Sequence, residues 1–170
     1  MENLRHKIPD FAKDVRLNLT SMLSGIASTG LSKDQAYGTV LSVVYATLNK
    51  ELIQEIEAVV EVNETVQTAA KSAASIMAMN NVYYRTVKQS GNDQLAQLPA
   101  GLRMQVIGKP GVDKVDFELF CLAVSALNGC NHCVSAHIAQ LSKAGMAITD
   151  IQWAIKAAAI IQATHTAISI

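Results

Sequence analysis

The stretch that decides the fold is residues 117–137, "FELFCLAVSALNGCNHCVSAH". Its first eleven residues are apolar except for Glu118 and one serine, and they contain no proline or glycine, which is typical of a buried helix. Asn128 and Gly129 then end that helix, because both residue types tolerate the left-handed backbone that terminates helices. A second helix follows, with Cys130 at or near its first turn. The stretch therefore predicts two helices joined by a tight turn.

The rest of the chain favours an all-α fold, a compact multi-helix domain. The three prolines, Pro9, Pro99 and Pro110, leave two long segments free of the strongest helix breaker. No run of alternating apolar and polar residues predicts a strand. We expect helices near 10–23, 33–48, 51–60, 64–89, 115–128, 130–143 and 150–168. The remaining long segment, 90–112, is a connection in which "GLRM" (101–104) could form one helical turn.

Local capping signals divide these helices. The expected signals are capping boxes at Ser32–Gln35 and Thr149–Gln152, an N-cap at Asn63, and C-terminal glycines at Gly91 and Gly145. A faint internal repeat pairs "ATLN" (46–49) with "SALN" (125–128) and "KSAASIM" (71–77) with "KAAAIIQ" (156–162). A possible internal duplication would place Glu51 and Gln54 opposite Cys130 and Cys133. Only the second half would then carry the chemistry.

Composition limits the function classes. The chain has 170 residues, 50% of them hydrophobic and 16% charged, with a formal net charge of zero. That length suits one domain, 1–170, and the absence of a basic patch argues against nucleic-acid binding. We find neither a signal peptide nor an apolar run long enough to cross a membrane. Three cysteines do not make a secreted disulfide framework, so we expect a cytoplasmic protein.

Three residues form one stripe on the second helix. At 100° per residue, Cys130, Cys133 and His137 fall within about 60° of one another, whereas His132 points away. A helix N-terminus stabilises a thiolate, which favours a redox pair. His137 follows Cys133 by four residues and is placed to act as its general base. Glu118 on the preceding helix is the natural carboxylate to orient that base.

Other interpretations of the cluster stay open. Cys130, Cys133, His137 and Glu118 could together bind zinc, although structural zinc sites usually draw their ligands as two pairs from separate segments. Glu118 could instead lie on a solvated face of its helix, and the two cysteines could be an incidental buried pair. Cys121 is expected to pack in the core as a small apolar residue.

Some polar residues carry no assigned role. His6 and His165 give no functional signal. We interpret the segment "MAMNNVYYR" (77–85) as a core stripe with polar ends. Its polar residues Asn80, Asn81 and Arg85 have no predicted function.

The spacing of Glu118, Cys130, His132, Cys133 and His137 resembles the signature of the alkyl hydroperoxidase D (AhpD) family. That family belongs to the wider carboxymuconolactone decarboxylase-like group of all-helical proteins. The likeness extends over nearly the whole chain, through "PDFAKDVRLNL", "MAMNNVYYR", "GLRMQVI" and "FELFCLAVSALNGC". Every position of the signature is present.

The resemblance implies an antioxidant thiol peroxidase and disulfide reductase that reduces alkyl hydroperoxides and regenerates an oxidised peroxiredoxin, AhpC. By analogy, Cys133 becomes the sulfenic acid. Cys130 donates a proton, resolves the intermediate to the Cys130–Cys133 disulfide and links to the peroxiredoxin, while Glu118, His132 and His137 form a proton relay. No cofactor or metal is expected to be bound. Electrons would come from a dihydrolipoyl group on an acyltransferase.

The residues themselves do not settle which cysteine attacks first, because Cys130 lies closer to the helix N-terminus and is expected to be the more exposed. A carboxymuconolactone decarboxylase-like lyase and a zinc-stabilised interaction module remain the alternative functions.

The last helix, "DIQWAIKAAAIIQATHTAISI" (150–170), is apolar nearly all round, which is typical of a helix buried on every side. Burial against further copies of the chain would satisfy it, and the family resemblance implies a homotrimer.

Overall fold

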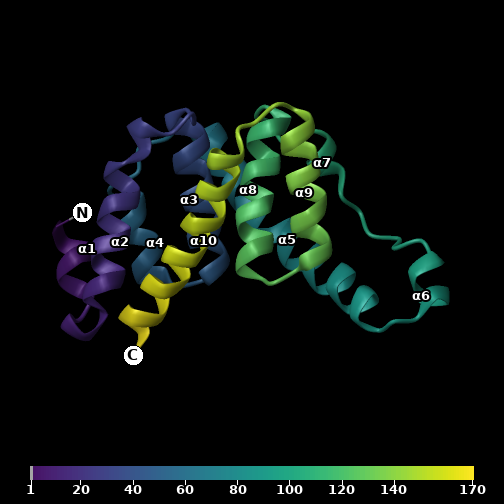
Figure 1. Cartoon of the computed structure of the whole chain (residues 1–170), viewed down its shortest axis with the longest axis horizontal. Coiled ribbons are helices and arrows are strands. Elements are labelled where there is room, and N and C mark those ends of the chain that lie inside the picture. The colour runs from purple at the N-terminus through teal and green to yellow at the C-terminus, as the bar shows by residue number, and fades with distance from the viewer. Residues whose placement is uncertain (1) are drawn as a thin grey trace.

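The fold is built from helices around one central helix, α8. The computed structural model describes residues 2–170, and within that range it contains ten α-helices, two 3₁₀ turns and no β-strand (Figure 1). The elements are α1 (Glu2–Lys7), η1 (Asp10–Ala12), α2 (Lys13–Ser24), η2 (Ile26–Ser28), α3 (Lys33–Thr47), α4 (Lys50–Glu57), α5 (Glu64–Gln89), α6 (Asp93–Gln97), α7 (Gln105–Gly108), α8 (Lys114–Leu127), α9 (Asn131–Lys143) and α10 (Ile148–Ser169). The all-α prediction is confirmed.

Helix α8 is central because most of its side chains are apolar and its middle turns are buried. Residues from Leu119 to Ser125 are all buried, and α8 packs against α3, α5, α9 and α10. Asp113 begins the helix by accepting a hydrogen bond from the Val115 backbone N–H at 2.7 Å. Gly129, with φ of 66°, follows the C-cap Asn128 and ends the turn after α8. The predicted pair of helices with a tight turn is therefore present.

Helix α3 lies very close to α8 where Gly38 faces an aromatic ring. A Cβ atom at Gly38 would overlap the ring of Phe120, so only glycine permits this approach. One turn further along α3, Ser42 Oγ also lies 3.3 Å from the Phe120 carbonyl oxygen. These contacts fix α3 against the helix that leads into the cysteine pair.

Most of the predicted local signals are confirmed. Ser32 and Gln35 form a capping box, and Asn63 Oδ1 accepts from the Val66 N–H at 2.9 Å. Gly91 and Gly145 follow their helices with φ of 62° and 84°, as helix-terminating glycines do.

Two predicted local features are wrong. The short turn in the connection falls on Gln105–Gly108 and not on "GLRM" (101–104), and α10 begins at Ile148 with Ala147 as N-cap, so Thr149 caps nothing. A tertiary contact accompanies the earlier start of α10, because Asp150 in its first turn accepts a hydrogen bond from the Gly30 N–H at 3.0 Å. The sequence also gave no sign of α1 or α6.

Helix α10 is buried along one face and not on every side. Its buried residues recur at helical spacing, from Ile151 through Ala154, Ala158 and Ile161 to Ala167, and they pack against α2, α3 and α8. Ala159 on the opposite face is exposed. The single chain therefore leaves part of the apolar circumference of this helix uncovered, and its burial against further copies stays a prediction.

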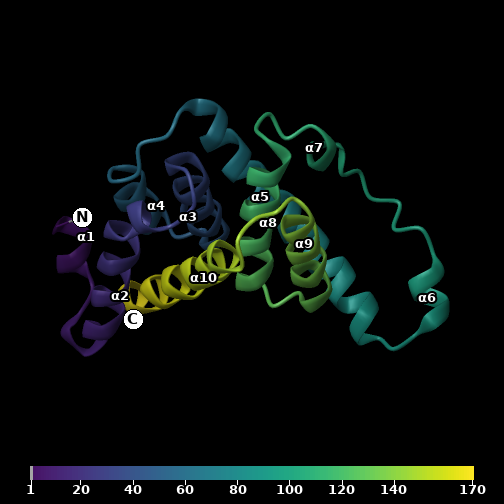
Figure 2. The ribbon, with the colours of Figure 1, turned by 45° about the horizontal axis from the view of Figure 1, so that its top comes forward.

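The segment that carries α6 projects away from the helical body (Figures 1 and 2). Its residues from Lys88 to Pro99 are all exposed, and none of them joins the core.

The possible internal duplication requires the same order of helices in both halves of the chain. The order helix–helix–long helix occurs in α3–α4–α5 and again in α8–α9–α10. Among the described helices, none is long and apolar enough to cross a membrane.

Candidate functional site

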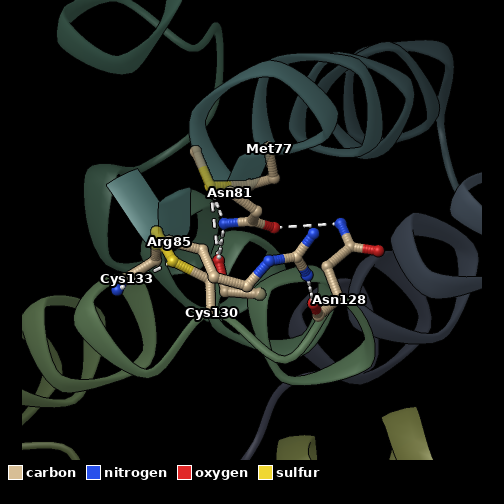
Figure 3. Close-up of a disulfide and its surroundings, with 7 residues drawn as sticks. Met77, Asn81, Arg85, Asn128, Cys130 and Cys133 are labelled. Carbon is tan, nitrogen blue, oxygen red and sulfur yellow. Dashed lines mark hydrogen bonds between the residues drawn. A yellow bond between two sulfur atoms is a disulfide. The ribbon is translucent and has the colours of Figure 1, made fainter. Parts of the chain in front are cut away.

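The two cysteines of the sequence motif are joined at the N-terminus of α9. Cys130 is the N-cap of that helix, and its Sγ accepts a hydrogen bond from the Cys133 backbone N–H at 3.3 Å. Cys130 and Cys133 form a disulfide with their Cα atoms 5.3 Å apart (Figure 3). The helix N-terminus carries a partial positive charge, which stabilises a thiolate when the bond is reduced. The pair therefore combines a disulfide with a helix end that would favour the thiolate form after reduction.

The exposure of the two sulfurs is the reverse of what we expected. Cys130 is 0% exposed and Cys133 is 6% exposed. As the N-cap, Cys130 lies where α8 meets α9, and α5 packs against both helices. Proximity to the helix end therefore does not make Cys130 the more exposed cysteine; both residues are buried, and Cys133 is the one that lines a pocket.

Glu118 and His137 form the predicted pair of a carboxylate and an oriented base. Glu118 Oε2 lies 2.6 Å from His137 Nδ1, and the two side chains are 22% and 11% exposed. An ionised carboxylate only accepts hydrogen bonds, so in a neutral His137 this contact assigns the proton to Nδ1 and leaves Nε2 as the acceptor. Glu118 is therefore a partner of His137 and not a residue of a solvated face.

A pocket of about 270 Å³ collects the remaining parts of the site. It is lined by Cys133, His137, His132, Tyr84, Asn80, Met77, Met104, Ile107 and Ala136. Three larger pockets, of about 280, 430 and 570 Å³, are lined by neither cysteine. The small pocket is the candidate active site because both Cys133 and His137, the partner of Glu118, line it.

His132 occupies the rim of this pocket. Its ring stacks on Tyr84, with the centroids 5.5 Å apart and the planes at 29°. It forms no hydrogen bond with either Glu118 or His137 in the described part of the chain. It nevertheless lines the same pocket, so the structure brings all five predicted residues to one region.

A polar network that the sequence did not reveal holds the turn before Cys130. Asn81 Nδ2 donates to Ser125 Oγ at 2.9 Å, and Asn81 Oδ1 accepts from Asn128 Nδ2, also at 2.9 Å (Figure 3). The Arg85 guanidinium donates to the Asn128 carbonyl oxygen. Asn81 and Arg85 thus clamp the α8–α9 turn from α5, and only their polarity inside a buried stripe could have indicated this.

Cys121 is the third cysteine and lies apart from the pair. It is free and buried on α8, as expected for a core residue. Burial, and to a smaller degree the negative charge of Glu118, raises the pKa of the Cys121 thiol well above its usual value. Such a thiol is protonated and unreactive at neutral pH.

The zinc alternative receives no geometric support. Residues 2–170 include no group of three or more His, Cys, Asp or Glu side chains arranged to hold a metal ion. The two sulfurs that such a site would need are bonded to each other.

Comparison with known proteins agrees with the site. The model of the carboxymuconolactone decarboxylase family matches residues 93–169. A protein named alkyl hydroperoxide reductase AhpD from Coxiella burnetii (strain RSA 493 / Nine Mile phase I) is 48% identical over 95% of this chain and 92% of its own. Another of the same name, from Bradyrhizobium sp. (strain ORS 278), is 51% identical over 99% of this chain and 92% of its own. The chain belongs to the AhpD family.

Membership of the AhpD family agrees with where the chemistry lies along the chain. The segment matched by the broader decarboxylase model begins at α6 and includes Glu118 and both bonded cysteines. The residues of α5 that clamp the turn lie outside that segment, whereas the AhpD relatives match nearly the whole chain.

Proposed function

We propose that this protein is a thiol peroxidase and disulfide reductase that reduces alkyl hydroperoxides through Cys130 and Cys133. One observation carries the proposal: a disulfide at a helix N-terminus faces a pocket that also holds a histidine oriented by a carboxylate. A lyase would need acid and base groups but no dithiol. The names of the relatives, alkyl hydroperoxide reductase AhpD, support the same activity.

In the first step His137 Nε2 takes the proton of the Cys133 thiol. The thiolate attacks the terminal oxygen of the hydroperoxide, so that an S–O bond forms as the O–O bond breaks. Sulfur is oxidised to the sulfenic acid, and the peroxide is reduced to an alcohol that receives the proton from His137. Cys133 has this role because it is the cysteine that lines the pocket.

In the second step Cys130 attacks the sulfenic sulfur. The disulfide forms and water leaves with the proton of Cys130. The hydrogen bond from the Cys133 N–H to Cys130 Sγ favours the thiolate of Cys130 and thus its role as the resolving cysteine. Glu118 keeps His137 in the tautomer that both proton transfers need, and His132 at the pocket rim completes the proposed relay.

Two further partners belong to the proposal through the family resemblance. A dihydrolipoyl group, carried by an acyltransferase, would reduce the disulfide, and oxidised peroxiredoxin AhpC would receive the electrons through a mixed disulfide with Cys130. Because Cys130 is buried, that link requires the α8–α9 turn to open after reduction. In single variants Cys130→Ser should lose the AhpC adduct; an adduct lost only in Cys133→Ser would move this role to Cys133.

We further propose that the protein acts in the cytoplasm as a homotrimer. Exposed Leu48 and Val82 beside an apolar pocket of about 570 Å³ favour contact with another copy, since a chain of zero net charge has little to keep such a surface soluble. The count of three rests on the family resemblance.

Counting fast-reacting thiols before and after mild peroxide tests the proposal. The reduced protein should lose two thiols per chain and regain them with dihydrolipoamide, while consuming cumene hydroperoxide in the presence of that donor. A protein whose thiols respond only after a chelator is added would be a metal module. Activity on a lactone that survives thiol alkylation would indicate a lyase.

A further inference from the structure

Asn80 is a buried side chain whose hydrogen-bonding groups have no partner. It lies on α5 and is 5% exposed, yet its amide makes no hydrogen bond within residues 2–170, and its Oδ1 is fully covered. Leaving such a group unpaired costs about 1–3 kcal/mol. Buried polar groups are otherwise nearly always satisfied, so this amide is expected to have a partner that is absent from the free chain.

The next residue shows that the position itself does not prevent pairing. Asn81 is also buried, with 1% of it exposed, and both ends of its amide are hydrogen-bonded, to Ser125 and to Asn128. Asn81 faces the turn that holds Cys130, whereas Asn80 faces the pocket of Cys133. One asparagine therefore supports the site and the other is directed at what enters it.

The pocket around Asn80 has the composition of a small-ligand site. Its lining combines apolar Met77, Met104 and Ile107 with a few polar side chains, namely Asn80 and, at the rim, Tyr84 and His132. Ligand sites combine apolar walls with a few placed polar groups that fix orientation. A volume of about 270 Å³ is small, and methionine side chains adapt to varied shapes. A compact organic molecule with one polar end fits this description.

We propose that the Asn80 amide binds the peroxide group of a small alkyl hydroperoxide, with the alkyl group against the methionines. The inference rests on the proposed function. In the reaction the terminal oxygen moves, with its hydrogen, from the peroxide to sulfur. The amide N–H can donate to the other peroxide oxygen, which becomes negative as the O–O bond breaks.

This role makes Asn80 a substrate-binding residue that costs stability. Asn80→Leu keeps the size of the side chain and removes an unpaired amide, so its Tm should equal or exceed that of the natural protein. Its second-order rate constant for sulfenic acid formation with cumene or tert-butyl hydroperoxide should fall about tenfold, the effect of losing one hydrogen bond worth about 1.4 kcal/mol. Asn80→Ala should show the same loss of rate.

Two reactions of the same cysteine separate binding from structure. Neither alkylation of Cys133 by iodoacetamide nor reduction of the disulfide by dihydrolipoamide involves a bound peroxide group. The rate constants of both reactions should therefore stay within twofold of the natural values in the Asn80 variants. Asn18→Ala, on the exposed surface of α2, is the matched control and should change nothing.

Three results would overturn the inference. An unchanged peroxide rate in both variants would exclude a binding role, and equal losses in all three reactions or a lowered Tm would make Asn80 structural. If the natural protein formed no sulfenic acid with any hydroperoxide, the proposed function would fail and this inference with it. That outcome is measured on the natural protein, before any variant is made, so it is distinguished from a failure of the Asn80 inference alone.

Discussion

Adjacent asparagines on α5 provide a matched test of how the site is held together. In Asn81→Leu two hydrogen bonds of 2.9 Å are lost, those to Ser125 Oγ and from Asn128 Nδ2. Each is worth about 1 kcal/mol net, and partners left unpaired add to the loss. Ser125 Oγ can still donate to Met77 Sδ at 3.4 Å, and the part-buried Asn128 amide can hydrogen-bond to water. Both alternatives limit the extra loss of stability from unpaired partners.

We therefore expect Asn81→Leu to lower the free energy of unfolding by about 2–3 kcal/mol. For a domain of this size that is roughly 4–12 °C in Tm. The same substitution at Asn80 removes no hydrogen bond and should cost nothing. The two variants have identical composition, so differences in hydrophobicity or helix propensity cancel.

The assay is thermal and urea unfolding of both variants at one protein concentration, because subunit association would make Tm depend on concentration. Asn81→Leu should also slow the formation of the Cys130–Cys133 disulfide, because the clamp on the turn before Cys130 is loosened. Equal loss of stability in the two variants would refute the reasoning, as would a greater loss in Asn80→Leu.

Three further predictions concern the reaction and the assembly. His137→Phe should lower peroxidase activity by ~10²–10⁴-fold, the usual value of a general base, and His132→Phe should cost far less, with Glu118→Gln between them; near-equal losses at the two histidines would contradict the assignment. The raised pKa of Cys121 keeps its thiol protonated at pH 8, so iodoacetamide should label it only at more alkaline pH or after unfolding, and peptide mapping after peroxide should find it outside the disulfide. Light scattering at micromolar concentration should give three times the chain mass of 18.2 kDa, and a monomer would exclude the proposed trimer.

The sequence determined the helices and the spacing of the reactive groups. Ser32–Gln35 and Asn63 cap their helices, and Asn128–Gly129 ends α8, because these interactions join residues only a few positions apart. Cys133 and His137 share a face by helical periodicity alone. Glu118 was identified as the partner of His137 because a lone acid in an apolar helix needs a reason to be there, and its 2.6 Å contact confirms this.

Only the tertiary structure decided which groups are paired, covered or left open. Asn81 reaches Ser125 and Asn128 across 44 and 47 positions of the chain, and no local pattern gives the distance between residues so far apart. The burial of Cys130 follows from the packing of α5 and α8 around the start of α9, which overrides its place at the helix end. Asn80 and Asn81 are adjacent residues of the same type. The Asn81 amide is hydrogen-bonded and the Asn80 amide is not, because the two side chains point from α5 toward different neighbours.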